Sequence, residues 1–152
     1  MKIEYVKGNL LDTEHQYILH GCNAQGVMGS GVAKAIRAKW PSAFSVYHVQ
    51  YTKWLQTLGS VTFAEQDDGK CIINAITQEF YGRDPETVYV SYTAINEALA
   101  RINWWLSEKH PFEIVSVAMP KIGAGLGGGD WEIISEIIEQ KAVHFKPVVY
   151  CL

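Results

Sequence analysis

Two glycine-rich segments constrain the fold of this chain more than any other feature, because each joins a strand pattern to a helical pattern. An apolar run at residues 17–19 leads into HGCNAQGVMGSG and then into a helix expected over residues 30–40. A second strand pattern at residues 113–119 leads into KIGAGLGGG and a helix expected over residues 130–140. Such strand–loop–helix units are typical of parallel sheets with helices packed on their faces.

The remaining hydrophobic pattern completes an α/β chain. Strands are expected at residues 2–6, 17–23, 60–66, 70–77, 113–119 and 147–152, and helices at 30–40, 41–59, 91–109 and 130–140. The segment DDG at residues 67–69, between two strand patterns, predicts a β-hairpin. We therefore predict a single α/β domain over residues 1–152, with a mixed, mostly parallel six-stranded sheet and helices on both faces.

The composition argues against several classes of protein. Hydrophobic residues make up 48% of the 152 residues and charged residues 19%, as in a compact globular domain. The net charge of −3, with no basic run, argues against broad nucleic-acid binding, although backbone N–H groups can still bind a small anion. The three cysteines have no C-x-x-C spacing, and no apolar run approaches the length of a membrane span. We therefore expect a cytoplasmic protein that associates with no membrane.

The two glycine-rich segments are also candidates for a phosphate site. The first glycine loop, residues 26–32, precedes a helix whose first N–H groups lack helical partners, and a tight turn is the alternative explanation. In the second glycine loop, residues 123–129, five of seven residues are glycine. Each of these glycines costs about 0.5–1 kcal/mol of conformational entropy relative to alanine. A turn needs one or two of them, so the second loop favours close approach of a ligand.

Three segments, KGNLL, HGCNAQGVMGSGVA and MPKIGAGLGGGDW, resemble in this order the ADP-ribose-binding macrodomain family, and the similarity covers nearly the whole chain. Among its members they look most like the small enzymes that remove phosphate from ADP-ribose 1″-phosphate. They are also similar to macrodomains that remove ADP-ribose from protein carboxylates or from DNA. The resemblance implies a three-layer α/β/α macrodomain that binds ADP-ribose or a derivative.

The resemblance also assigns parts of ADP-ribose to these segments. Asn9, where many members carry aspartate, and the Leu10 N–H would contact adenine, and a turn is the alternative role of Asn9. The two glycine loops would clamp the pyrophosphate, and the distal ribose would meet Asn23, Val27 and Met28. The residues expected to bind the ligand are Asn9, Leu10, Gly26, Val27, Met28, Gly29, Ser30, Gly31, Val32, Ile122, Gly123, Ala124, Gly125, Leu126 and Tyr81.

Three residues are candidates for the chemistry at the distal ribose. His20 is a candidate general acid or base near neutral pH, with a buried core histidine as the equally weighted alternative. Asn23 would orient a hydroxyl group or the attacking water. Asp130 would activate water, although capping the following helix is the commoner role of aspartate in this position. Cys22 is expected to be a small buried hydrophobic residue rather than a nucleophile.

Two positions depart from the pattern of related hydrolases. Members that act on DNA or glutamate carry a lysine where this chain has Gln78, and the glutamate-directed ones carry a carboxylate at Gly127. Since glutamine forms no Schiff base, a lysine mechanism is disfavoured, whereas Asp130 matches an acidic position of some DNA-directed relatives. Gln78, Tyr81 and Arg83 form a further candidate wall. Tyr81 would stack on ribose or adenine and Arg83 would meet a terminal phosphate, with an exposed loop as the simpler explanation.

We therefore expect an enzyme that hydrolyses ADP-ribose 1″-phosphate to ADP-ribose and phosphate. One alternative is a hydrolase that removes ADP-ribose from ADP-ribosylated protein or DNA. The other is a non-catalytic module that reads or sequesters ADP-ribose. No metal or cofactor is expected, because no cluster of His, Cys or carboxylate residues has ligand spacing.

Overall fold

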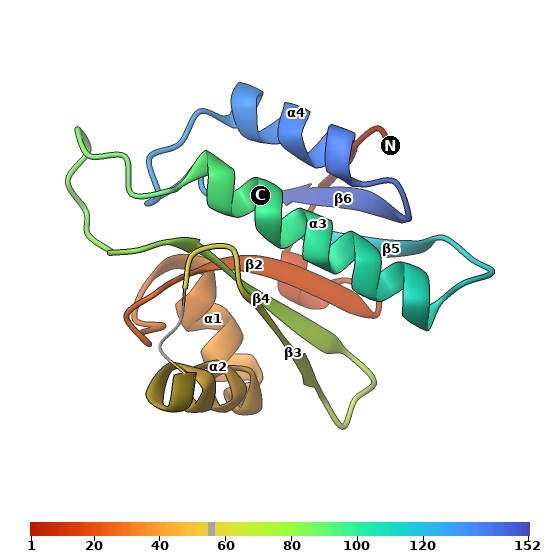
Figure 1. The fold of residues 1–152 in the computed structure, drawn as a ribbon, viewed down its shortest axis with the longest axis horizontal. Coiled ribbons are helices and arrows are strands. Elements are labelled where there is room, and N and C mark those ends of the chain that lie inside the picture. The colour runs from red at the N-terminus through yellow and green to blue at the C-terminus, as the bar shows by residue number, and fades with distance from the viewer. Residues whose placement is uncertain (55–56) are drawn as a thin grey trace.

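The computed structural model describes residues 1–54 and 57–152 and shows a six-stranded sheet between two layers of helices (Figure 1). The strands are β1 (Glu4–Lys7), β2 (Tyr17–Asn23), β3 (Val61–Glu65), β4 (Cys71–Gln78), β5 (Val115–Met119) and β6 (Phe145–Cys151). The helices are η1 (Leu10–Asp12), α1 (Gly31–Lys39), α2 (Pro41–Trp54), α3 (Tyr92–Lys109) and α4 (Trp131–Lys141). The predicted fold class is confirmed: every pair of neighbouring strands is parallel except β3 and β4.

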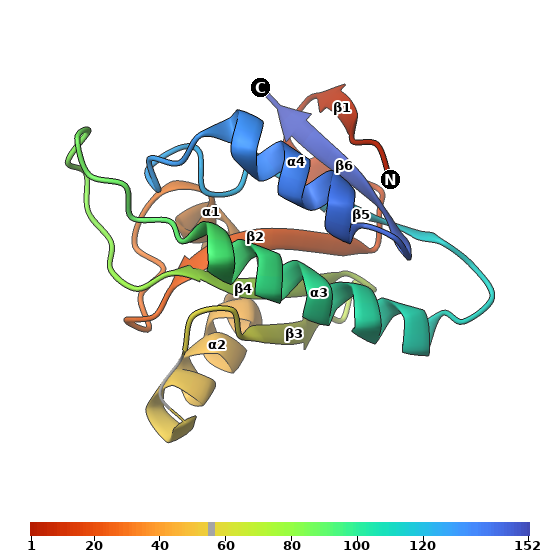
Figure 2. The ribbon, with the colours of Figure 1, turned by 45° about the horizontal axis from the view of Figure 1, so that its top comes forward.

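Alternation along β2 divides the core into two layers, because successive side chains of a strand point to opposite faces. Tyr17 and Leu19 belong to the larger core cluster, which contains the buried faces of α3 and α4. Ile18 lies on the opposite face in a cluster with Ile36 of α1. Figures 1 and 2 show α3 and α4 on one side of the sheet and α1 and α2 on the other. Within the described ranges, none of the helices is sufficiently long and apolar to cross a membrane.

The strand order places β2 at a branch point of the chain. In the order β1-β6-β5-β2-β4-β3, the central strand β2 lies between β5 and β4, and it is parallel to both. From β2 the chain passes through α1, α2 and β3 to reach β4, and α3 then carries it across the sheet to β5. The carboxyl ends of β2, β4 and β5 therefore meet at one edge, where the connections diverge.

The predicted elements are found in the predicted order, with shifts at their ends. The hairpin is confirmed, since β3 and β4 pair antiparallel and Gly69 in the turn has φ +88°. The helix expected over residues 41–59 is described as Pro41–Trp54: residues 55–56 lie outside the described ranges, and residues 57–59 are not helical. Gly59, the expected cap, has φ +85°, and its N–H donates to the carbonyl oxygen of Ile76 in β4.

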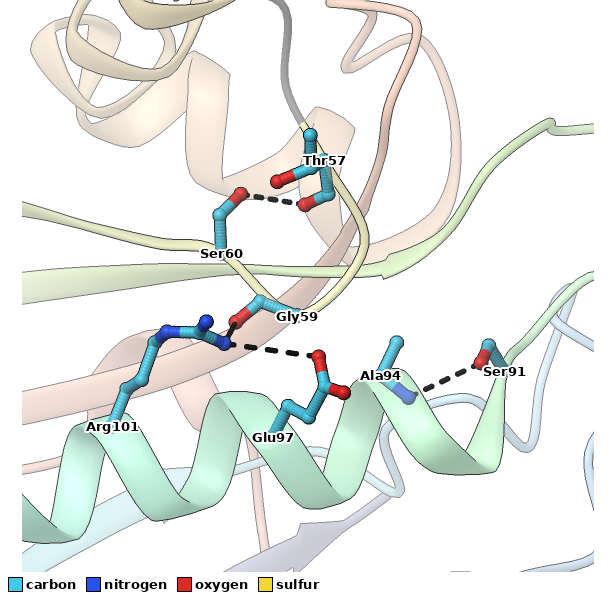
Figure 3. A network of polar contacts seen from close by, with 7 residues as sticks. All are labelled: Thr57, Gly59, Ser60, Ser91, Ala94, Glu97 and Arg101. Carbon is cyan, nitrogen blue, oxygen red and sulfur yellow. Dashed lines mark hydrogen bonds and ion pairs between the residues drawn. The ribbon is translucent and has the colours of Figure 1, made fainter.

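Side chains of α3 hold the segment that leads into β3 (Figure 3). Nη1 of Arg101 donates to the carbonyl oxygen of Gly59 at 2.6 Å and lies 3.9 Å from Oε2 of Glu97. Within the segment, Oγ of Ser60 donates to the carbonyl oxygen of Thr57 at 2.7 Å. The antiparallel edge strand β3 therefore starts from a turn that is attached to α3. This helix lies on the opposite side of the sheet from α2.

Candidate functional site

A cavity of about 670 Å³ opens at the carboxyl ends of β2, β4 and β5. Its walls come from the end of β2, the first glycine loop with the start of α1, the end of β4 with the segment after it, and the second glycine loop. The lining residues are His20, Gly21, Cys22, Asn23, Val27, Gly29, Ser30, Gly31, Val32, Ala33, Thr77, Gln78, Tyr81, Gly82, Arg83, Pro120, Lys121, Ile122, Gly123, Gly125, Leu126 and Gly127. Both glycine loops thus meet at one site, which is the usual ligand position in an α/β sheet.

The amino-terminal end of α1 forms one wall of this cavity. Ser30 is the N-cap residue, but its side chain makes no capping hydrogen bond, and the first turn contains no acidic residue. The lining residues 29–33 include this first turn, whose N–H groups have no partner within the helix. The helix dipole adds a partial positive charge at the same end. The start of α1 is therefore suited to bind an anion such as phosphate.

The charged side chains at the cavity are cationic. Among the described lining residues, Arg83 and Lys121 carry positive charge, and none is Asp or Glu. The site is therefore locally positive although the chain has a net charge of −3. This distribution favours an anionic ligand, and it leaves no carboxylate at the wall to act as a general base.

The structure gives the glycines of the second loop two different explanations. A Cβ at Gly127 would lie 2.7 Å from the carbonyl oxygen of Gly123, and one at Gly128, with φ +71°, would lie 2.6 Å from that of Thr87. At Gly125, which lines the cavity, a Cβ would meet nothing within 4 Å. Close packing of the chain therefore accounts for Gly127 and Gly128, and the prediction that ligand approach explains the whole run is corrected. Gly125 is therefore a lining position of this loop at which an added Cβ has open space.

Most residues predicted to bind the ligand do line the cavity. They are Val27, Gly29, Ser30, Gly31, Val32, Ile122, Gly123, Gly125, Leu126 and Tyr81. Gly26 and Ala124 lie in the same loops but outside the lining set. Asn9 and Leu10 also lie outside it: Oδ1 of Asn9 accepts from the N–H of Leu11 at 3.0 Å and caps η1, and Leu10 is buried in the core. The alternative role of Asn9, a residue that stabilises a turn, is the one that the geometry favours.

Met28 does not cover the sugar position as predicted. Its side chain is 1% exposed and packs in a core cluster with Cys22, Tyr47 and Ile76, behind the first glycine loop. An unbranched thioether fills such an irregular space well. The adjacent Val27 lines the cavity, so of these two neighbours it is Met28 whose side chain packs in the core.

His20 belongs to the cavity lining, but its ring is buried and bonded in the core. It is 1% exposed, and its Nε2 lies 2.5 Å from Oδ1 of Asn74. Burial lowers the pKa of His20 to about 4, although the hydrogen bond to Asn74 acts in the opposite direction. The ring is therefore neutral at pH 7 and already bonded, and this geometry favours the buried core histidine over a general acid or base.

Asn23 lies at the cavity wall, but its amide group is used by the turn that follows β2. Its Nδ2 donates to the carbonyl oxygen of Val27 at 2.8 Å, and its Oδ1 accepts from the N–H of Gln25 at 3.0 Å. The side chain therefore shapes the turn that leads into the first glycine loop, and its orientation is set by these bonds. The role of orienting water stays a prediction.

Asp130 has the capping role that was its alternative, and Cys22 has the buried role that the sequence predicts. Oδ1 of Asp130 accepts from the N–H of Glu132 at 2.9 Å and caps α4, and the residue lies outside the lining of the cavity. The Cys22 thiol is buried, and burial raises its pKa far above the usual range, so it stays protonated. Neither geometry supplies a base or a nucleophile for a ligand in the cavity.

Residues at the ends of β4 and β5 were missed by the sequence reasoning. Thr77 from β4 and Pro120 and Lys121 after β5 all line the cavity. Thr77 ends one predicted strand, Pro120 and Lys121 follow another, and the carboxyl ends of parallel strands meet at one edge. That rule, applied to every strand instead of only to the glycine-rich loops, would have identified them.

Comparisons with known proteins agree with this geometry. A family model described as Macro domain matches residues 19–138. Over 137 residues the chain is 30% identical to the DNA ADP-ribosyl glycohydrolase of Mycobacterium tuberculosis. The matched region covers 88% of this chain but only 37% of that protein. It is 27% identical to the ADP-ribose 1″-phosphate phosphatase of Candida albicans, with 97% and 99% of the two chains covered.

A solved structure shows the same arrangement. The macrodomain of M. tuberculosis DarG has a TM-score of 0.80 and 28% sequence identity to this chain, with 99% of this chain and 97% of that one covered. The family model spans most of the sheet and both glycine loops, so the match includes the cavity and its walls. This chain belongs to the Macro domain family.

Proposed function

We propose that this protein binds ADP-ribose in the cavity and hydrolyses ADP-ribose 1″-phosphate to ADP-ribose and phosphate. One observation carries the proposal: the uncapped start of α1 lines a cavity whose charged side chains are Arg83 and Lys121. The pyrophosphate is placed at this helix end, against the second glycine loop, where backbone N–H groups bind oxygen atoms. The phosphatase of Candida albicans, which the chain matches over almost its full length, supports this choice of reaction.

Hydrolysis at this site relies on positioning and charge. Water attacks the phosphorus atom, the bond between phosphorus and the ribose oxygen breaks, and that oxygen takes up a proton. Arg83, a cation at the cavity wall, stabilises negative charge on the phosphoryl group. Since no carboxylate lines the described cavity and the His20 ring is bonded in the core, proton transfer falls to water. We therefore expect slow turnover compared with enzymes that carry a general base.

The binding step is tested by calorimetric titration of the wild type, Gly125→Glu and Gly125→Ala with ADP-ribose. The glutamate would bring bulk and negative charge into the cavity, whereas a Cβ at this position meets nothing within 4 Å. We expect binding by the wild type and by the alanine variant, and loss of binding in a still-folded glutamate variant. Equal binding by all three would place the ligand elsewhere and remove the basis of the proposal.

The catalytic step is tested by phosphate release from ADP-ribose 1″-phosphate. Gly125→Glu, purified in the same way, is the control for contaminating phosphatases. Release by the wild type alone would support the proposed reaction. If the protein binds ADP-ribose but releases no phosphate, the remaining function is that of a non-catalytic module that reads or sequesters ADP-ribose.

A second candidate function is removal of ADP-ribose from DNA. Tyr81, which lines the cavity, is 55% exposed, the preceding Phe80 is 64% exposed, and Arg83 follows them in the lining. Exposed aromatic rings next to a cation are suited to stack bases of a single strand. The similarity to the mycobacterial DNA ADP-ribosyl glycohydrolase supports this alternative, although the chain spans 37% of that protein. Loss of the label from an ADP-ribosylated single-stranded oligonucleotide would show it, and full retention would exclude it.

A further inference from the structure

Three side chains of α2 contact the turn between β2 and the first glycine loop from behind. The Tyr47 hydroxyl donates to the carbonyl oxygen of Asn23, with an O···O distance of 2.6 Å, and accepts from the N–H of Val27 at 3.1 Å. One position further along α2, Nδ1 of His48 lies 3.1 Å from the carbonyl oxygen of Gly26. One turn later, the Tyr51 ring closes the space beside Gly26, where a Cβ would lie 2.6 Å from Cδ1 of the ring.

We propose that Tyr47 is a positioning residue for the ligand, which holds the first glycine loop in its binding conformation. The proposal rests on the proposed function, since the ligand that it concerns is ADP-ribose. Tyr47 is fully buried and lies outside the lining of the cavity, so it acts through the loop and not by touching the ligand.

The hydroxyl is placed where it controls the course of the loop. It bonds to both ends of the Asn23–Val27 turn, so it fixes the distance between the end of β2 and the residues that enter the cavity. It also lies 2.9 Å from Oδ1 of Asn23, the atom that accepts from the N–H of Gln25. One phenol group thus orders both the backbone and the Asn23 amide of this turn.

The N–H groups in the loop divide into two sets. Those of Ala24, Gln25 and Val27 bond within the protein: Ala24 to the end of β4, Gln25 to the Asn23 side chain at the end of β2, and Val27 to Tyr47. The N–H groups of the first turn of α1 have no helical partner and lie at the cavity wall. The first set anchors the loop so that the second set is preorganised, and preorganised donors avoid the cost of ordering when the ligand binds.

The test compares Tyr47→Phe with the matched control Tyr17→Phe. Tyr17 is also buried, and its hydroxyl lies 2.6 Å from Nε2 of His110, near the opposite end of β2. Three quantities are measured on each protein: the ADP-ribose dissociation constant, the urea midpoint, and the hydrogen-exchange rate of the Val27 amide. If a tyrosine only stabilises the fold, its replacement by phenylalanine should change the urea midpoint but neither the ADP-ribose dissociation constant nor the exchange rate of the Val27 amide.

We expect Tyr47→Phe to bind ADP-ribose about tenfold more weakly, because one buried hydrogen bond is lost on each side of the turn. Exchange of the Val27 amide should become faster in the same variant. Tyr17→Phe should show a lower urea midpoint with wild-type affinity and wild-type exchange at Val27. If the wild type binds and Tyr47→Phe binds within twofold of it, the inference is overturned while the proposed function stands. If the wild type binds no ADP-ribose, the proposed function fails first.

Discussion

Nε2 of His20 and Oδ1 of Asn74 lie 2.5 Å apart in the core behind the cavity. Nδ2 of Asn74 donates to the carbonyl oxygen of Ala43 and to Oγ1 of Thr62, each at 3.1 Å, which fixes the orientation of the amide. Since Oδ1 can only accept, Nε2 of the histidine carries the proton. The pair therefore connects β2 to β4, β3 and α2, and it supports the sheet edge from which the ligand loops leave.

The stability of the protein should fall in acid because of His20. Its pKa in the folded protein, about 4, lies below the ordinary 6.5, so the unfolded chain binds a proton that the folded protein does not. Stability from this source is complete above the unfolded pKa and is lost as the pH falls from 6.5 to about 4, by about 3 kcal/mol in all. Urea unfolding at pH 7, 5.5 and 4 measures this loss. His20→Gln keeps an N–H donor but cannot titrate, so its curve should be flatter, and parallel curves would contradict the assignment.

Asp130→Ala should cost stability and leave ligand binding intact. The carboxylate caps α4 by accepting from the N–H of Glu132, and loss of an N-cap of this kind costs about 1 kcal/mol. Asp130→Ser retains a capping oxygen and should recover most of that loss. Urea unfolding and ADP-ribose titration of both variants check this. Loss of phosphate release in both variants, with full binding, would instead restore the carboxylate as a catalytic group.

Arg83→Ala should weaken ADP-ribose binding by several-fold and reduce the salt dependence of the affinity. The guanidinium is a cation at a cavity without lining carboxylates, and a charged contact near the surface is screened by salt. Lys146→Ala is the charge-matched control, because Lys146 pairs with Glu4 near the start of β6, away from the carboxyl ends. Titrations at two salt concentrations make the comparison. Equal effects of the two variants would mean that net charge, and not position, controls the affinity.

Adjacent tryptophans of α3 should differ in their effect on stability. Trp105 stacks on Phe63 with ring centroids 4.0 Å apart and meets the Tyr17 ring edge-on at 6.1 Å. Trp104 is 64% exposed, since neighbouring residues of a helix point in different directions. Trp105→Ala should cost about 3 kcal/mol, and Trp104→Ala about 0.5 kcal/mol or less. Urea unfolding distinguishes them, and similar losses would show that Trp104 also packs in solution.

The order of the strands and helices, the hairpin and the α4 cap were predictable from the sequence. Each depends on residues close together in the chain: the alternation in Val61–Glu65, the glycine at position 69, and Asp130 before the α4 pattern. The resemblance also placed both glycine loops at one site, whereas the pairing of β2 with β5 that brings them together is seen only in the structure. The family resemblance rested on the same local segments, and the family match confirmed it.

The roles of individual side chains depended on contacts between distant parts of the chain. His20 is paired with Asn74, 54 residues away, so its ring is neutral in the core instead of available at the ligand. Met28 and Val27 are adjacent, and only packing against Tyr47 and Cys22 decides that the Met28 side chain lies in the core while Val27 lines the cavity. Tyr47 itself has no motif that marks it. Local preferences set where elements begin and end, whereas burial and hydrogen bonding between elements set which atoms face the cavity.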